Sequence, residues 1–462
     1  MNTPTLLSNS SYVVVGGGAA GTLTAARLLL EAGRQHQPVR VTLVDPTPIG
    51  RGVAYSTSDP RHRLNVPAYK MSALTEDGSH FHRWLADHGR EVAEADFVPR
   101  RWFRDYLCDV LEKAKCWAPS AVLEQREASA VDLVPGEFGA TTVELSTGES
   151  IAADAVVLAL GHLGVDRRWV PAPIATSSRV IRDPWAYGAL DAVPPNADVL
   201  LVGSGLTMID LALRLAAPGR TIHAISRNGR LPQPHLPGVR PGMEAPEFSS
   251  PTPCLDELLT VMTNHAAKAR NRYGDWRPAI DSIRAITQRL WGGLSETDRI
   301  EFLTKHARTW DSVRHRMSPE SAASIDRCRQ SGQLVTHTAE LVDALDLGDS
   351  LEVVLSGGTA LRVGAVVNCT GPCDRPERSE VPFVRALLDR GVVRPGPLGI
   401  GFATTSSGRV IDATGSSDAS VWTLGSLRKG SLWESTAIPE IRDQAAALAR
   451  CVLTNTPVPA QR

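Results

Sequence analysis

One glycine-rich turn constrains the fold of this chain more than any other feature of its sequence. Residues 12–15 (Tyr-Val-Val-Val) are typical of a strand buried on both faces. They lead directly into Gly-Gly-Gly-Ala-Ala-Gly at residues 16–21, and a pattern rich in Ala and Leu follows to residue 32. Residues 39–45 then resemble a second strand that ends in an acid. This order predicts the first βαβ unit of a doubly wound parallel sheet.

The turn has the spacing of a dinucleotide-binding fingerprint. Gly16 permits the tight turn, Gly18 lets a pyrophosphate approach the backbone, and Gly21 lets helix and strand pack closely. The helix that starts near Ala19 and Ala20 would offer free N–H groups and a partial positive charge to the phosphates. We therefore predict a dinucleotide at this turn rather than a glycine turn without a ligand.

The residues that follow favour FAD over NAD in this half. Asp45 can accept hydrogen bonds from the adenosine ribose, and a second glycine-containing loop places Arg51 and Gly52 near the expected pyrophosphate. Asn65 and Arg100, in two later segments, are further candidates for contact with the cofactor. For Arg51 and Arg100, a solvated surface position is an equally good interpretation.

The chain also contains a relative of itself. Residues 143–161 and 353–371 align at a constant offset of 210, and eight of the 19 positions are identical, including the closing Gly161 and Gly371. Each stretch predicts a hairpin followed by a buried strand that ends in glycine. Because a strand, a glycine turn and a helix pattern precede each of them, we predict two copies of one architecture.

The second glycine turn departs from the first at one position. Within residues 198–217, Gly203 and Gly205 repeat the first two glycines, and a helix follows from Leu206. Met208 replaces the third glycine, so helix and strand should lie slightly farther apart. This half is still expected to bind a dinucleotide.

The residues after the next strand indicate which dinucleotide. Residues 221–225 end in Ser226 and Arg227, with Arg230 close behind, where an NAD-binding protein carries an acid. Arginine and serine suit a 2′-phosphate by charge and hydrogen bonding. We therefore predict NADPH in this half; the alternative is that both arginines are merely exposed.

These observations predict an α/β protein with two Rossmann-like domains, like the two-domain flavoproteins of the glutathione reductase type. The FAD-binding domain would be discontinuous, at residues 1–165 and 366–462, and the NAD(P)H-binding domain would span 166–365. A helical insert is expected at about 251–332, where three tryptophans indicate a packed unit.

Arg314, His315 and Arg316 stand together in this insert and could bind an anionic substrate or a cofactor phosphate; a solvated helix end is the alternative. In the C-terminal segment, a helix that follows Gly425 and Glu434 would place N–H groups near the pyrimidine side of a bound flavin.

Composition excludes several other classes of function. The formal net charge of −1 provides no basic field for nucleic acid, and no apolar run is long enough to span a membrane. Residues 1–5 do not resemble a signal peptide, so a cytoplasmic protein is expected. The seven cysteines have neither zinc nor disulfide spacing, and no metal is predicted. Cys369 and Cys373 could form a redox pair, but two reduced thiols are the expected state.

With these motifs in hand, the chain resembles bacterial FAD/NAD(P)-binding proteins related to class B flavin monooxygenases, including the amine N-hydroxylases. The resemblance implies FAD reduced by NADPH and then reaction with O2. It departs from the Baeyer–Villiger fingerprint, because the residue four before Trp185 is Ile181 and not His. Ketone oxygenation is therefore disfavoured.

The predicted function is that of an FAD-dependent, NADPH-consuming oxidoreductase: a monooxygenase, N-hydroxylase-like, acting on a small polar metabolite. The alternative is a reductase or dehydrogenase that passes electrons to a quinone or protein acceptor; a binding protein without hydride transfer is a third interpretation. No catalytic dyad stands out. His162 and His235 lie where chain ends should approach the site and are weak candidates for a proton relay.

Overall fold

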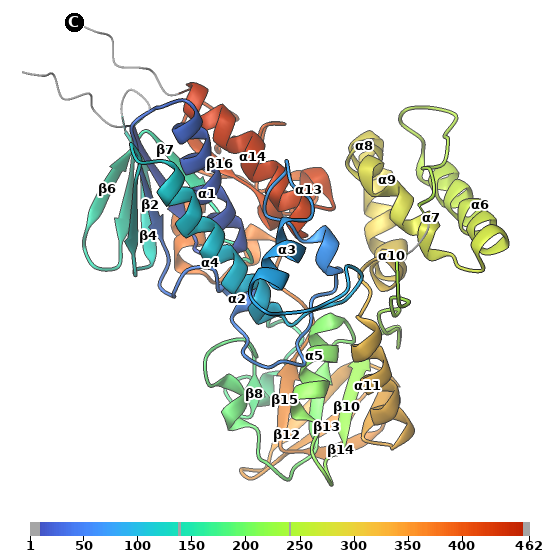
Figure 1. Ribbon diagram of the computed structural model, residues 1–462. Helices are drawn as coiled ribbons and strands as arrows, with labels where there is room; N and C mark the ends of the chain where they lie inside the picture. Colours follow the sequence, from blue (N-terminus) through green and yellow to red (C-terminus); the bar gives the residue numbers. More distant parts are fainter. Residues whose placement is uncertain (1–9, 137–139, 240–241, 456–462) are drawn as a thin grey trace, which may run out of the picture.

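The structure is a computed structural model that describes residues 10–136, 140–239 and 242–455. Residues 1–5, which carried the expectation about a signal peptide, lie outside the described part. Figure 1 shows two α/β bodies, one above the other, with a group of helices beside them. None of the described helices is long and apolar enough to cross a membrane.

The first body is built on a five-stranded parallel sheet in the order β16-β7-β1-β2-β3. Its strands are β1 Ser10–Val15, β2 Val39–Val44, β3 Val122–Arg126, β7 Ala155–Leu158 and β16 Val421–Thr423. One face is covered by helices, namely α1 Ala19–Arg34, α4 Arg100–Trp117 and α14 Ile438–Asn455. The other face carries an antiparallel sheet of β4 Ala130–Pro135, β5 Thr141–Leu145 and β6 Ser150–Ala153.

Strand β1 shows why the central strands of this body are continuously apolar and do not alternate between apolar and polar residues. Tyr12 and Val14 pack into the core beneath the helices, whereas Val13 and Val15 pack toward the antiparallel sheet. All four residues are at most 4% exposed. A strand covered on both faces has no solvent side, which accounts for the continuous Tyr-Val-Val-Val.

The second body repeats this plan with a parallel sheet in the order β11-β10-β9-β15-β8. Its strands are β8 Val180–Ile181, β9 Val199–Val202, β10 Ile222–Ser226, β11 Leu334–Thr338 and β15 Ala365–Asn368. Helices α5 Leu206–Leu215 and α11 Pro319–Gln330 cover one face. The antiparallel strands β12 Leu341–Asp346, β13 Leu351–Leu355 and β14 Ala360–Val363 cover the other.

The predicted internal repeat is confirmed strand by strand. The bounds of β5, β6 and β7 each recur 210 residues later, in β13, β14 and β15. Two expected boundaries need correction. Strand β15 pairs with β9 and β8, so the chain returns to the first body after Asn368 and not at residue 366. Helix α11 packs against α5 through Ala322 and Ile325, so it belongs to the second body and not to the insert.

The insert proper consists of the helices drawn in yellow in Figure 1. They are α6 Leu255–Tyr273, α7 Arg277–Ser282, η5 Ile283–Ile286, α8 Thr287–Gly293, α9 Glu296–Glu301, the π-helical turn η6 Phe302–His306 and α10 Ala307–Arg314. Trp291 and Phe302 form a small core with Trp433 from the C-terminal segment, and the indole of Trp291 donates to the carbonyl of Gly430 at 2.8 Å. The insert is therefore anchored on the first body.

The remaining elements are short and lie in the connections. They are α2 Gly52–Tyr55, η1 Ala68–Lys70, α3 His80–Asp87, η3 Ala172–Ile174, η4 Ala189–Ala192, η7 Pro376–Arg378, α12 Pro382–Asp389, η8 Pro397–Gly399, η9 Gly425–Arg428 and α13 Lys429–Leu432.

Candidate active site between two dinucleotide-binding domains

The first glycine turn has no room for side chains at two of its predicted positions. Gly16 has a φ of +108°, and a Cβ there would lie 2.4 Å from the carbonyl oxygen of Ala159 at the end of β7. A Cβ at Gly21 would lie 1.7 Å from the oxygen of Gly16. Both contacts are shorter than atoms tolerate, which confirms the tight turn and the close packing inferred from the spacing.

The second loop lies over this turn, as the sequence predicted. The amide of Gly50 donates to the carbonyl of Gly17 at 2.8 Å, and a Cβ at Gly52 would lie 2.9 Å from the Cα of Gly18. Gly18 is the N-cap of α1, so the amides of Ala19 and Ala20 stand in its first turn, without acceptors inside the helix. Such amides bind the pyrophosphate of a dinucleotide, and the residues present fit FAD here.

The carboxylate of Asp45 holds the first glycine turn in place through a hydrogen bond. Its Oδ2 accepts from the amide of Gly17 at 2.6 Å, and its Oδ1 accepts from the amide and the hydroxyl of Thr47, each at 2.7 Å. The acid at the end of β2 thus fixes the conformation of the glycine turn, a role that the spacing alone did not indicate. Arg51, the N-cap of α2, is exposed.

The second glycine turn also has no room for a side chain at its first glycine. Gly203 has a φ of +115°, and a Cβ there would lie 2.2 Å from the oxygen of Cys369. Cys369 follows β15 as Ala159 follows β7, 210 residues earlier. Gly205 has no atom within 4 Å of a Cβ position, so a ligand can approach the backbone at the start of α5. Met208 is fully buried; the wider spacing that it implies stays a prediction.

The loop after β10 is organised by hydroxyls. The Ser204 hydroxyl donates to the carbonyl of Arg230 at 2.6 Å and lies 2.9 Å from the Ser226 hydroxyl, which also accepts from the amide of Gly229. Arg227 is 68% exposed, and its Nε lies 3.9 Å from a carboxylate oxygen of Glu340. At that distance and exposure the pair is weak, and the guanidinium is available to a ligand.

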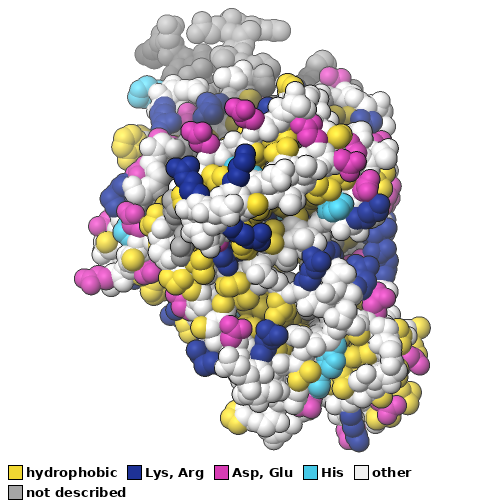
Figure 2. All heavy atoms as spheres, turned by 90° about the vertical axis from the view of Figure 1, so that its right-hand side faces the viewer, with side chains coloured by type: hydrophobic (Ala, Val, Ile, Leu, Met, Phe, Trp, Pro, Cys, Tyr) yellow, Lys and Arg dark blue, Asp and Glu magenta, His cyan; other side chains and the backbone are white. Residues whose placement is uncertain are grey.

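A cavity of about 1350 Å³ opens between the two bodies and the insert. Figure 2 views the molecule from the side of the insert, where Lys and Arg side chains are spread across the middle of the face. The cavity wall includes seventeen of the residues singled out in the sequence: Asn65, Gly161, His162, Gly203, Gly205, Leu206, Ser226, Arg227, Arg230, His235, Arg314, His315, Arg316, Cys369, Gly371, Cys373 and Glu434. The first glycine turn, with Asp45, Arg51, Arg100 and Gly425, lies outside this wall.

The C-terminal segment joins the wall immediately after Gly425. Gly425 has a φ of +70°, and its amide donates to the side chain of Gln444 in α14 at 3.1 Å. The hydroxyl of the next residue, Ser426, donates to the carbonyl of Gly161 and lies in the wall. The closing glycine of the first repeat and the C-terminal segment therefore meet at the cavity.

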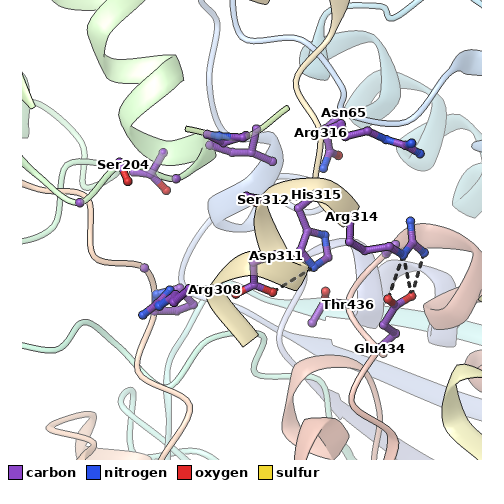
Figure 3. Close-up of a pocket in the computed structure, with 18 of the residues that line it drawn as sticks. Asn65, Ser204, Arg308, Asp311, Ser312, Arg314, His315, Arg316, Glu434 and Thr436 are labelled. Atoms are coloured by element: carbon purple, nitrogen blue, oxygen red, sulfur yellow. Dashed lines mark hydrogen bonds and ion pairs between the residues drawn. The ribbon is translucent and has the colours of Figure 1, made fainter. Parts of the chain in front are cut away.

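Several charged residues predicted as ligand contacts are instead bound to each other. Arg314 holds Glu434 through three hydrogen bonds, of 2.8, 3.1 and 2.7 Å, and both side chains are nearly buried (Figure 3). Arg316 is 2% exposed and paired with Asp281. Arg314 and Arg316 are thus neither solvated nor free to bind an anion, whereas His315 between them is exposed in the cavity wall, 3.8 Å from Asp311.

Arg100 is paired with an acid of the second body, so the solvated surface position is wrong, while its contact with a cofactor stays a prediction. Its guanidinium lies 2.7 Å from the carboxylate of Asp210 in α5, and the side chain of His62 lies 3.2 Å from the Asp210 carbonyl oxygen. Burial raises the pKa of Asp210, while Arg100 and His62 act to lower it. Arg100 therefore connects the two bodies, which the sequence did not reveal because α4 and α5 belong to different repeats.

The two candidate histidines differ in their surroundings. His235 donates from Nε2 to the carbonyl of Asn65 at 3.1 Å and packs on the ring of Phe97. Burial, and then the charge of Arg316, lower its pKa to about 3, so it is neutral at physiological pH with Nδ1 as an acceptor. His162 is exposed at the cavity edge.

The cavity wall has an excess of cations without an ion pair, and the sequence indicated only one of them, Arg230. Each of its seven carboxylates has a basic partner; these are Asp166, Asp281, Asp311, Glu340, Asp374, Glu434 and Glu440. Four cations in the wall have no ion pair with any described residue, namely Lys70, Arg230, Arg308 and Arg378. Such a wall favours anionic ligands.

Two sets of side chains bear on metal and thiol chemistry, namely the possible metal ligands and the two cysteines of the cavity wall. No group of three or more His, Cys, Asp or Glu side chains within them could hold a metal ion. Cys369 and Cys373 line the cavity as free thiols, 4% and 7% exposed, and burial raises the pKa of both. Thiols of this kind are poor nucleophiles.

Comparison with known proteins agrees with this geometry. Residues 13–163 match a family described as FAD-NAD(P)-binding. An L-aspartate N-monooxygenase (nitrosuccinate-forming) from Streptomyces cremeus is 29% identical over 275 residues, which cover 50% of this chain and 41% of that relative's length.

Solved structures of low sequence identity share the fold over nearly the whole chain. L-lysine 6-monooxygenase from Pseudomonas syringae is 15% identical, with a TM-score of 0.63 over 96% of this chain and 99% of that one. The FAD-bound cadaverine monooxygenase from Erwinia amylovora is 13% identical, with a TM-score of 0.63 over 98% and 97%. The chain therefore carries an FAD-NAD(P)-binding region at residues 13–163, is similar in sequence to one N-monooxygenase over half of its length, and shares its fold with solved flavoprotein monooxygenases.

Proposed function

We propose that this protein is an NADPH-dependent flavin monooxygenase that oxygenates the amino group of a small anionic amino acid. The observation that carries the proposal is the cavity, whose wall joins the second glycine turn, the C-terminal segment and an excess of unpaired cations. When bound, FAD would accept a hydride from NADPH and activate O2. The chain's own residues would hold both nucleotides and the substrate around this space.

The two glycine turns would supply the dinucleotide positions. FAD would be held by the amides of Ala19 and Ala20, the close approach at Gly18 and Gly52, and the loop at Arg51. NADPH would be held at Gly203, Gly205 and Leu206, with Ser226 and Arg227 at the 2′-phosphate. Gly371, Gly425 and Asn65 would border the place where the two cofactors meet.

The charge of the wall favours an acidic substrate over a diamine. A diamine such as cadaverine needs carboxylates to receive its ammonium groups, and every carboxylate of the wall already has a basic partner. An amino acid with a carboxylate can instead reach an unpaired cation such as Lys70 or Arg378. The name of the Streptomyces cremeus relative, an L-aspartate N-monooxygenase, points the same way.

His235 would keep the amine-binding region free of an additional positive charge. Its neutral ring can accept a hydrogen bond at Nδ1 from an incoming ammonium or amine, because Nε2 is already committed to Asn65. The Arg314–Glu434 and Arg284–Glu440 pairs would hold the insert against the C-terminal segment and so exclude water from the cavity.

The alternative of a thiol or quinone reductase has weaker support. The thiols of Cys369 and Cys373 are buried, and a cationic wall does not suit a neutral apolar quinone. The cytoplasmic location expected from the sequence stays a prediction.

A substrate panel tests the proposal. FAD-loaded protein is incubated with NADPH, O2 and one amine at a time: aspartate, glutamate, lysine, ornithine or cadaverine. We expect aspartate or glutamate to raise NADPH oxidation and to yield a product oxygenated at nitrogen. Preferential turnover of the diamines would contradict the assigned substrate class, and hydrogen peroxide as the sole product with every amine would contradict the oxygenase.

A further inference from the structure

Arg308 is an unpaired cation on the helical insert, within the cavity wall. It lies in the first turn of α10 and has no ion pair or hydrogen bond with another described residue. Three other residues of α10 do have partners. Thr309 accepts a hydrogen bond from Arg230, Asp311 lies near His315, and Arg314 is paired with Glu434. Arg308 therefore has no structural partner that accounts for its position in the wall.

The position of Arg308 is on the nucleotide side of the cavity. Figure 3 shows Arg308 on the same side as Ser204, which belongs to the second glycine turn, whereas Glu434 and Thr436 lie on the opposite side. Two further contacts fix α10 there. The guanidinium of Arg230 donates to the hydroxyl of Thr309, and the amide of Gln233 donates to the carbonyl of Ser312 at 2.8 Å. The segment after β10 thus runs along α10.

This segment starts at the loop where a 2′-phosphate would bind. Ser226 ends β10, Arg227 follows it directly, and Arg230 comes four residues after Ser226. The Ser226 hydroxyl is already engaged by Ser204 and Gly229, and Arg227 is largely solvated. A phosphate that carries close to two negative charges is bound best where several cations converge. The loop by itself provides one exposed arginine and one serine.

We propose that Arg308 of the insert, together with Arg230, completes the 2′-phosphate site of NADPH, so that the insert selects NADPH over NADH. This inference rests on the proposed use of NADPH and adds a residue from outside the Rossmann domain. The π-helical turn η6 Phe302–His306 lies directly before α10 and shifts the helical register, so that it sets which face Arg308 occupies.

The test uses two nucleotide fragments that differ only in the 2′-phosphate. Adenosine 2′,5′-bisphosphate and adenosine 5′-monophosphate are titrated calorimetrically into FAD-loaded protein, so the readout does not depend on turnover. The variant is Arg308→Ala. The matched control is Arg289→Ala in α8, an exposed arginine of the same insert that lies outside the cavity wall and is in no ion pair with a described residue.

For Arg308→Ala we expect binding of the bisphosphate to weaken by on the order of tenfold, which corresponds to one charge-assisted contact. The affinity for the monophosphate should be unchanged, and Arg289→Ala should behave as the wild type with both. Retention of FAD by Arg308→Ala, measured from flavin absorbance, shows that the variant is folded.

The outcomes separate this inference from the proposal beneath it. If the wild type prefers the bisphosphate over the monophosphate, but Arg308→Ala binds the bisphosphate as tightly as the wild type does, the assignment of Arg308 is wrong and the use of NADPH stands. Equal weakening with both nucleotides would also overturn the assignment, because the 2′-phosphate would not be the group recognised. If the wild type shows no preference for the bisphosphate, the assignment of NADPH itself fails and this inference fails with it.

Discussion

The guanidinium of Arg314 and the carboxylate of Glu434 form a bidentate ion pair across 120 residues of sequence, with side chains 12% and 8% exposed. A second pair, Arg284–Glu440, joins the same two parts of the chain at 2.6 and 2.7 Å. Together with the stacking of Trp291 on Trp433, these contacts make the insert and the C-terminal segment one continuous wall.

Removing either partner of the Arg314–Glu434 ion pair should destabilise the protein. Glu434→Ala leaves the nearly buried Arg314 without its counter-charge, which costs about 3 kcal/mol. We expect a melting temperature lower by several degrees, measured by calorimetry, and a double-mutant cycle with Arg314→Ala should show coupling. Arg362→Ala, which breaks a solvated pair with Asp349, is the control and should leave the melting temperature unchanged. Equal effects of Glu434→Ala and Arg362→Ala would refute the structural role.

Gly16→Ala should abolish FAD binding. The added Cβ would lie 2.4 Å from the oxygen of Ala159, and the φ of +108° is strained for alanine, so the turn must open. The ratio of bound flavin to protein measures the effect. Gly148→Ala is the control, because Gly148 also has a positive φ, of +85°, but lies in a hairpin turn with open space around it. Full flavin content in Gly16→Ala would show that FAD binds elsewhere.

Gly203→Ala should impair the use of NADPH while leaving FAD bound. Its Cβ would lie 2.2 Å from the oxygen of Cys369, in the second body, so the damage should fall on NADPH. We expect the variant to retain FAD and to lose reduction of the flavin by NADPH, followed from the flavin absorbance under anaerobic conditions. Loss of FAD with intact NADPH binding would reverse the assignment of the two turns.

Stability should fall as the pH is lowered from about 7 to 5. The pKa of His235 is about 3 in the folded protein, below the value of a solvated histidine, so the unfolded chain takes up its proton first. The stabilisation is complete above the unfolded pKa, near 6.5, and is lost as the pH falls toward 3. Between pH 7 and 5 this amounts to about 1 to 2 kcal/mol.

Urea unfolding of the wild type and of His235→Gln at both pH values measures this contribution. Glutamine retains a donor for the Asn65 carbonyl but does not titrate, so the variant should lose less stability between pH 7 and 5 than the wild type does. An identical pH dependence in the two proteins would show that His235 does not contribute.

The cavity thiols should be dispensable for turnover. Cys369 and Cys373 are buried, and their pKa values are raised, so neither is suited to thiol–disulfide exchange. The Cys369→Ala/Cys373→Ala variant should oxidise NADPH at a rate within about twofold of the wild type. Loss of flavin reoxidation in this variant, with normal FAD content, would favour a dithiol reductase.

The fold could be predicted because its signals are local. Gly16, Gly18 and Gly21 mark a turn whose geometry depends on neighbouring residues, and the hairpins that end at Gly161 and Gly371 each form within about 20 residues. The boundary at residue 366 was placed too early, although the repeat at an offset of 210 makes β15 the counterpart of β7 and so assigns it to the second body.

The ion pairs could not be predicted in the same way. Arg100, Arg314 and Glu434 are charged residues in plausible cofactor segments, and only tertiary placement shows that Asp210 and Glu434 take up these arginines. Arg308 is the converse case: nothing in its sequence context separates it from other surface arginines, and its significance comes from the cavity that it faces. The roles assigned to individual cofactor-binding residues stay predictions.

One experiment tests the central claim, that two dinucleotide-binding domains meet at one cavity to oxygenate an amine. FAD-loaded protein is mixed anaerobically with NADPH, and oxygenated buffer with aspartate or glutamate is then added while flavin absorbance and products are followed. The account predicts flavin bleaching by NADPH, faster than by NADH, and one N-oxygenated amine for each NADPH oxidised. A protein that holds no flavin after FAD is added, or that returns only hydrogen peroxide with either substrate, would contradict it.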